Sequence, residues 1–332
     1  MNLRRFLKER QPEADSKISL WLLRQMKGLA DAVMLIHNLD QQITTTHLQV
    51  PVAAGKKEKK QGYHHDLKPE NMLLFYIGSD YTEGSLKISD FGMGKVNRVP
   101  QGSQIISKRT RTLSGTLTYE SPDFEMHQKT GRPHDMWALG CVFLELLCWL
   151  FIAPQSGGKS FQTDRMAPLS SKDSGILSDS FYFMTTKEGG KIPKLKPVVV
   201  KWMDAIKENP CCKDEFLCIL ELIGKAGGLL EPEMHTRMRA ETLNQELGKI
   251  LQSATNRLKA TPNHYTGNVS QARKVTEDSL CEEPASPTDT PMISRQVTNS
   301  PPPPPEGPTI ASLPEIVFQE IENGEPANTP GR

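Results

Sequence analysis

The sequence lacks the features that mark secreted, membrane-anchored or nucleic-acid-binding proteins. Its six cysteines form no Cys-x-x-Cys pair and no cluster with histidine, which is typical of reduced thiols in an intracellular protein. The first residues, MNLRRF, contain no apolar run, so no signal peptide is predicted. The formal net charge is +1, so no global field favours nucleic acid or an acidic membrane. We therefore expect an intracellular protein, cytoplasmic or nuclear, that binds neither nucleic acid nor a membrane.

Long apolar runs are scarce as well. Residues 137–153 are apolar apart from Glu145, and this length is at the short limit for a bilayer span. The alternative is a fully buried helix of a globular domain. The charge in the middle of the run and its short length favour the buried helix.

A relaxed phosphate-loop pattern occurs at residues 153–160 (APQSGGKS), but its surroundings do not suit that function. A phosphate loop needs a strand before it and a helix after it. Here an apolar helix is predicted before it, and a polar stretch with Pro168 follows. Phosphate binding by Lys159 is therefore not predicted.

The most informative stretch is residues 64–75, HHDLKPENMLLF. Proline restricts the backbone, so the part up to Pro69 is predicted to be a loop, and the apolar part after it a short strand. Asp66 can accept a proton from a hydroxyl group, and Lys68 can hold a phosphate. Asn71 can bind a hard cation through its side-chain oxygen.

A second short strand ends in a carboxylate at residues 86–92, LKISDFG. Turn residues lie between it and the strand predicted at 72–77, so the two strands are expected to form a hairpin. This hairpin would bring Asn71 and Asp90 together, where they could share one or two Mg²⁺ ions and hold a triphosphate.

Residues 66–71 (DLKPEN) followed by residues 90–92 (DFG) resemble the catalytic loop and the magnesium loop of eukaryotic protein kinases. The resemblance is specific because two independent motifs occur in the right order. It implies a Ser/Thr kinase that uses ATP and Mg²⁺ and acts on a protein substrate. The resemblance assigns these roles: Asp66 accepts the substrate proton, Lys68 neutralises the γ-phosphate, Thr116 helps to fix Asp66, and Asn71 and Asp90 hold Mg²⁺.

The resemblance continues after the magnesium loop. Residues 93–119 are basic and rich in hydroxyl groups, like the activation segment of Ser/Thr kinases, and residues 121–123 (SPD) replace the family's Ala-Pro-Glu. Residues 135–140 (DMWALG) match the family's Asp-x-Trp-x-x-Gly, in which the Asp holds the backbone of the catalytic loop. Arg237 stands where the family has the partner of the Ala-Pro-Glu glutamate. Asp123 is one methylene shorter than that glutamate, so the pattern alone does not establish the ion pair.

Apolar spacing predicts helices around these motifs. Ser16 can cap a helix whose stripe comprises Leu22, Met26, Leu29, Val33 and Ile36. Leu3, Phe6 and Leu7 form a shorter stripe that Pro12 ends. Two more stripes fall within residues 198–254: Phe216, Ile219, Leu220 and Ile223, then Leu243, Leu247, Ile250 and Leu251.

The expected fold is mainly α: a protein-kinase-like C-terminal lobe with a small β-hairpin over residues 1–256. Long loops are expected at residues 41–62 and 154–198. The helix containing GCVFLE at residues 140–145 is most similar to that of fungal-type Ser/Thr kinases.

The patterns of a kinase N-terminal lobe are not found. No Gly-x-Gly-x-x-Gly occurs in the sequence, and no Val-Ala-x-Lys precedes residue 64. The resemblance therefore covers the large lobe only, and the small lobe is expected to be absent from this chain. Two functions remain open. One is a Ser/Thr kinase whose activity in this chain alone is doubtful, and the other is an inactive pseudokinase that serves as a scaffold or binding module.

The composition changes from about Thr261. About half of the 25 prolines lie beyond residue 260, among Ser, Thr and Glu, so this part cannot bury enough apolar surface to offset its ordering entropy. Residues 257–332 are expected to form a disordered tail. Its consecutive prolines, Pro301–Pro305, could dock a proline-recognition domain as a polyproline II helix.

Overall fold

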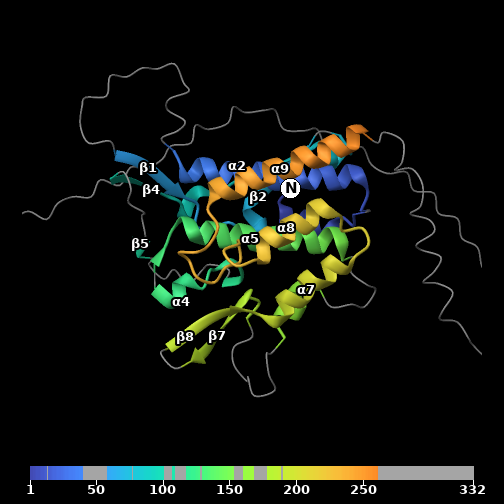
Figure 1. Ribbon diagram of the computed structural model, residues 1–332. Helices are drawn as coiled ribbons and strands as arrows, with labels where there is room; N and C mark the ends of the chain where they lie inside the picture. Colours follow the sequence, from blue (N-terminus) through green and yellow to red (C-terminus); the bar gives the residue numbers. More distant parts are fainter. Residues whose placement is uncertain are drawn as a thin grey trace, which may run out of the picture. The chain divides into compact units, whose positions relative to one another are not determined.

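A buried helix, α5 (Arg132–Phe151), runs through the middle of the structure (Figure 1). Pro133 lies in its first turn, where a proline is tolerated because the N–H has no helical partner there. Every residue from His134 to Phe151 is buried. Protein surrounds the helix, which explains why its apolar residues occur on all sides. α5 is long and apolar enough to cross a membrane, yet its apolar window is wholly buried within the structure. The buried helix predicted from the sequence is therefore confirmed.

The computed structural model describes residues 1–12, 14–39, 58–76, 78–100, 107–108, 117–127, 129–152, 160–167, 178–187 and 190–260. These residues belong to one compact unit, Met1–Tyr265. They are mostly helical, with small antiparallel sheets of two strands each, as expected for a kinase-like fold. The Pro-rich stretch predicted as a tail lies outside the described residues from residue 261 onward.

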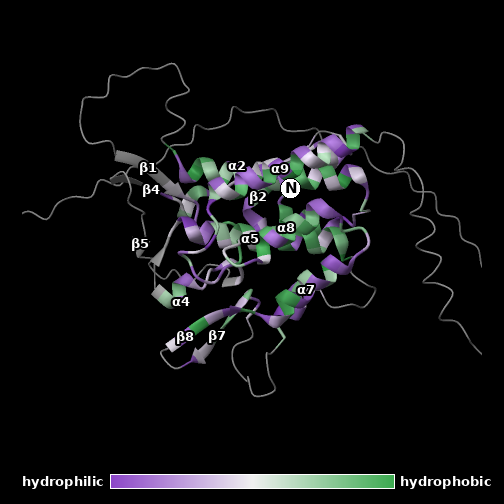
Figure 2. Cartoon of the chain, in the orientation of Figure 1, coloured by the Kyte–Doolittle hydropathy of each residue, from purple (hydrophilic) through white to green (hydrophobic). Residues whose placement is uncertain are grey.

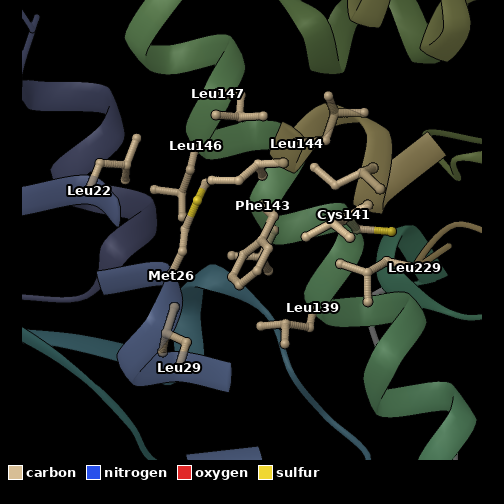
Figure 3. Close-up of a cluster of buried hydrophobic side chains, with 14 of the residues drawn as sticks. Leu22, Met26, Leu29, Leu139, Cys141, Phe143, Leu144, Leu146, Leu147 and Leu229 are labelled. Atoms are coloured by element: carbon tan, nitrogen blue, oxygen red, sulfur yellow. The ribbon is translucent and has the colours of Figure 1, made fainter. Parts of the chain in front are cut away.

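One long helix packs against α5, and a second long helix packs against the first. α2 (Ser16–His37) and α9 (Ala240–Ala260) lie side by side in Figure 1. The apolar stripe of α2 faces α5, and Figure 3 shows Leu22, Met26 and Leu29 opposite the side chains of α5. Four of the five predicted stripe residues of α2 are at most 1% exposed. Figure 2 shows apolar colour along much of α5 and mixed colour on α9.

The start of α2 differs from the sequence-based expectation. Ser16 is the first helical residue, and Asp15 is the cap because its carboxylate accepts from the Ile18 N–H at 2.7 Å. Asp and Ser are both favoured as N-cap residues, so residue type alone does not show which of the two neighbouring positions caps the helix. The shorter helix α1 (Leu3–Glu9) forms as predicted and buries Leu3 and Phe6.

The predicted hairpin is present as β2 (Met72–Phe75) and β3 (Ser85–Ile88), paired antiparallel with Met72 opposite Ile88. Helix α2 holds its turn. Trp21 Nε1 donates to the carbonyl oxygen of Gly84 at 3.0 Å, and Gln25 Oε1 accepts from the Leu86 N–H at 2.8 Å. The turn end of the hairpin is therefore anchored to the helical core.

The predicted long loops contain regular structure. Residues 41–62 include most of β1 (Glu58–Tyr63), which pairs with β4 (Lys95–Pro100). Residues 154–198 contain α6 (Phe161–Arg165) and a hairpin of β7 (Tyr182–Lys187) and β8 (Gly190–Leu195). The sequence analysis missed these elements because their residues are mostly polar. A hairpin that projects from the lobe buries little surface, so its strands do not require alternating apolar and polar residues.

The remaining elements follow in chain order. Short ones are β5 (Ser107–Lys108), α4 (Asp123–His127) and β6 (Lys129–Thr130). The C-terminal helices before α9 are α7 (Pro197–Glu208) and α8 (Asp214–Gly224). The apolar stripe predicted in α8 is wholly buried, and α9 continues to Ala260, four residues past the predicted boundary at residue 256.

Gly140 allows α5 to approach the chain at Leu229. A Cβ atom added at Gly140 would lie 2.7 Å from Leu229 Cβ, closer than real side chains approach. We expect Gly140→Ala to lower the free energy of unfolding by about 1–3 kcal/mol, because overpacking a close contact forces neighbours to shift. Urea unfolding at neutral pH measures this change.

Gly28→Ala is the matched control. Gly28 lies inside α2 with nothing within 4 Å of an added Cβ, so alanine should raise stability by up to about 1 kcal/mol. Equal effects of the two substitutions would contradict the close-packing explanation.

Candidate active site

Asp66 lies at the centre of a hydrogen-bonded cluster on the loop before β2. Lys68 Nζ donates to Asp66 Oδ2 at 2.8 Å. Asn71 Nδ2 donates to the same carboxylate oxygen and to the Asp66 backbone carbonyl, both at 2.9 Å. The Asp66 side chain remains 28% exposed, so it can reach a ligand while two neighbours fix its direction. The structure thus brings together three of the predicted site residues.

A side chain of α5 binds the backbone of the two residues before Asp66. Asp135 accepts from the N–H groups of His64 and His65, each at 2.8 Å, and from His37 Nε2 at 2.9 Å. Asp135 is fully buried, which opposes its charge, yet the hydrogen bonds and the charge of His37 hold its pKa below the usual value. This is the contact that the resemblance assigned to Asp135.

Asn71 and Asp90 lie at the open end of the β2–β3 hairpin. Ser89 donates to the Asn71 carbonyl oxygen through its N–H at 2.8 Å and through Oγ at 2.9 Å, so Asp90 follows the residue paired with Asn71. Asp90 has a left-handed backbone (φ 62°) and is exposed. Such a conformation in a non-glycine residue is uncommon and is often found at functional sites.

These two side chains fit a Mg²⁺ site in their chemistry. A carboxylate and an amide oxygen are the hard ligands that Mg²⁺ prefers, and the ion usually completes its shell with water and substrate phosphates. The Nδ2 group of Asn71 is engaged by Asp66, so its Oδ1 atom is the one left to ligate a cation. Among the described residues no group of three or more His, Cys, Asp or Glu is placed to hold a metal by itself.

The Arg237–Asp123 pair forms despite the shorter carboxylate. Arg237 donates through Nη1 and Nη2 to the two oxygens of Asp123 at 2.7 and 2.8 Å, and both side chains are at most 3% exposed. Ser121 Oγ donates to Asp123 Oδ2 at 2.9 Å. The Ser-Pro-Asp sequence therefore keeps the bidentate pair that the resemblance implies.

A buried polar cluster around Glu145 was not predicted. Glu145 Oε2 accepts from the Tyr119 hydroxyl at 2.8 Å and lies 3.3 Å from Arg4 Nη1, while Oε1 lies 3.1 Å from Arg165 Nη2. Burial and the Glu145 charge raise the pKa of Tyr119, which keeps it protonated. Arg4 also pairs with Glu70 of the catalytic loop at 2.9 Å. The only signal in the sequence was an acid in the middle of an apolar helix.

Several predicted site residues lie outside the described part of the chain. Thr116 is one of them, and so are Lys159 and Pro301–Pro305. Their predicted roles, or lack of one, remain predictions.

Asp135→Asn should weaken the structure in a pH-dependent way. The amide cannot accept from both N–H groups and His37 as a carboxylate does, so we expect a loss of about 3 kcal/mol at pH 7. Because the folded pKa of Asp135 is lowered, its contribution is present above the unfolded pKa and is lost as pH falls through the folded value. The stability difference between the two proteins should therefore shrink below about pH 4.

Urea unfolding from pH 7 to pH 3 measures this difference, with Asp204→Asn on the exposed side of α7 as the control. A difference that stays constant over the range would show that Asp135 does not act through its charge.

Comparison with known proteins agrees with this geometry. Residues 58–190 match the protein kinase domain family. Similar proteins include Serine/threonine-protein kinase ATG1b of Arabidopsis thaliana, 32% identical over 41% of this chain and 18% of its own length. Serine/threonine-protein kinase nekl-2 of Caenorhabditis elegans is 29% identical over 38% of this chain and 32% of its own length. Probable serine/threonine-protein kinase pXi of Dictyostelium discoideum is 40% identical over 26% of this chain and 11% of its own length.

The chain therefore spans at most about a third of the length of these relatives. The matched part of the chain is therefore similar to protein kinase domains, and the relatives that it matches are named as Ser/Thr kinases.

Proposed function

We propose that this chain supplies the catalytic loop of a Ser/Thr protein kinase, which transfers the γ-phosphate of ATP to a hydroxyl group of a protein substrate. The observation that carries the proposal is the cluster in which Lys68 and Asn71 both contact one carboxylate oxygen of Asp66. A carboxylate fixed in this way and partly open to solvent is suited to accept a hydroxyl proton.

Each residue has one task in this proposal. Asp66 orients the acceptor hydroxyl and takes its proton as the oxygen forms a bond to the γ-phosphorus, while the bond from that phosphorus to the bridging oxygen breaks and ADP leaves. Lys68 lies beside Asp66 and offers positive charge to the transferred phosphoryl group. Asn71 and Asp90 hold Mg²⁺, which when bound neutralises charge on the nucleotide phosphates. Thr116 would help to fix Asp66.

The catalytic effect is mostly positioning and electrostatics. The backbone of the loop is fixed by Asp135, and its 3-10 turn Pro69–Asn71 leads directly into β2. Asp66 and Asn71 are therefore presented by anchored backbone, which limits the reorganisation needed at the moment of reaction.

A second candidate function is an inactive pseudokinase that serves as a scaffold or binding module. Its motivating observation is that the 332 residues contain neither the Gly-rich loop nor the Val-Ala-x-Lys sequence that grips ATP phosphates. Under either function we propose an intracellular location, and a proline-recognition domain as a partner of Pro301–Pro305.

The 332-residue chain should bind Mg-ATP weakly, with a dissociation constant well above about 0.1 mM, because only one wall of the nucleotide site is identified in it. Isothermal calorimetry with Mg-ATP measures this affinity. Micromolar binding by the wild-type chain, lost in Asp90→Asn, would contradict the prediction and favour an active kinase.

Substitution of the site residues tests catalysis. In a preparation that transfers phosphate, Asp66→Asn should lower kcat by at least about a hundredfold, because general-base groups contribute about 10²–10⁴ in rate. Asp90→Asn should have a comparable effect that rising Mg²⁺ partly restores.

Asp204→Asn and Lys159→Ala are the controls and should leave the rate within about twofold. Loss of activity on Lys159→Ala, with Asp66→Asn harmless, would move the site to the phosphate-loop pattern.

A further inference from the structure

His134, the residue before Asp135 on α5, contacts two segments that are far apart in the sequence. Its Nε2 atom lies 3.2 Å from the carbonyl oxygen of His65. On its other side, Nδ1 lies 3.4 Å from the Ser121 backbone nitrogen and 3.0 Å from Ser121 Oγ. The side chain is only 4% exposed, so protein groups rather than water surround it.

The partners assign the tautomer of His134. A carbonyl oxygen only accepts, so Nε2 carries the proton that is donated to His65. In the neutral ring Nδ1 is then the acceptor, and the Ser121 N–H points at it. Ser121 keeps its hydroxyl proton for Asp123, to which it donates at 2.9 Å. In this arrangement Nδ1 accepts from the Ser121 N–H alone, and its 3.0 Å contact with Ser121 Oγ is not a hydrogen bond.

The bond to His65 acts at a conformationally demanding position. His65 has a left-handed backbone, with φ of 73°, which costs energy for a residue with a Cβ atom. Asp135 accepts from its N–H at 2.8 Å, and the neighbouring His134 donates to its C=O. Two successive residues of α5 thus hold both ends of His65.

The carbonyl of His65 belongs to the peptide bond that leads into Asp66. A planar peptide links the orientation of this carbonyl to the N–H of Asp66 and hence to the start of its side chain. On the far side, Ser121 stands where the family has alanine, whose methyl group cannot donate to Asp123 as Ser121 does. Through Ser121 and Asp123 the chain of hydrogen bonds continues to Arg237.

We propose that His134 is a positioning residue that fixes the peptide bond before Asp66 and links it to the Ser121–Asp123–Arg237 group. The catalytic consequence rests on the proposed function, whereas the positioning of the loop does not. His134 acts through His65 and touches no reacting atom.

Three substitutions separate the two bonds. His134→Gln places an amide N–H near the position of Nε2 and can keep the bond to His65, but it loses the acceptor for Ser121. His134→Asn places its amide near Nδ1 and can keep the contact with Ser121, but it loses the bond to His65. His134→Phe keeps an aromatic ring and loses both bonds, and exposed His235→Asn is the control.

Hydrogen exchange of the 332-residue chain, followed by mass spectrometry, gives the first readout. Asn and Phe at residue 134 should speed exchange of the His64 and His65 amides by about tenfold or more, and Gln should stay within about threefold. At the Ser121 amide the two effects should be exchanged: His134→Gln should speed hydrogen exchange, and His134→Asn should leave it nearly unchanged. Exchange in α9 should be the same in all variants.

Two results would overturn the proposal. One is exchange at His64 and His65 that stays within about twofold in both Asn and Phe variants. The other is exchange that rises equally in the loop, at Ser121 and in α9, since this would show a general loss of packing. The crossed effects of Gln and Asn cannot arise from packing alone.

Kinetics gives the second readout in a preparation that transfers phosphate. Asn and Phe should lower kcat by about tenfold, with KM for ATP within about twofold, and Gln should restore most of the rate. Unchanged kcat together with faster loop exchange would overturn the catalytic part. If the wild-type protein transfers no phosphate, the proposed function fails, and the exchange result still decides the role of His134.

Discussion

The carboxylate of Asp135 is the contact on which the site depends. It is fully buried, and it offsets the cost of burying its charge by accepting from two backbone N–H groups of the catalytic loop and from His37. The loop therefore rests on the first turn of a helix that the core encloses on all sides. Any displacement of α5 would be transmitted to Asp66 through rigid backbone.

The same helix carries a second buried acid ten residues further on. Glu145 joins Arg4, Tyr119 and Arg165, and Arg4 also reaches Glu70 of the catalytic loop. A third link, between Arg237 and Asp123, ties the end of the activation segment to the chain before α9. Buried ion pairs of this kind contribute little net stability, but removing one partner is costly, so they favour a single arrangement of the segments.

Sequence reasoning succeeded where the signal is local or strictly periodic. The stripes of α2 and α8, the all-round apolar character of α5 and the β2–β3 hairpin follow from burial periodicity and turn residues, and the structure has each of them. It failed for α6 and the β7–β8 hairpin, whose polar sequences resemble loops, and for the cap of α2, where Asp15 and Ser16 are equally suitable.

By itself the sequence determined which groups are available: an acid, a base and an amide within six residues, a second acid after a short strand, and a buried helix to support them. Only the tertiary structure decided which groups from distant segments meet. The Asp123–Arg237 pair spans 114 positions, and His134 lies 69 positions from His65. Contacts at such separations leave no local pattern, because packing of the whole lobe and not the neighbouring residues sets the distance between their backbones.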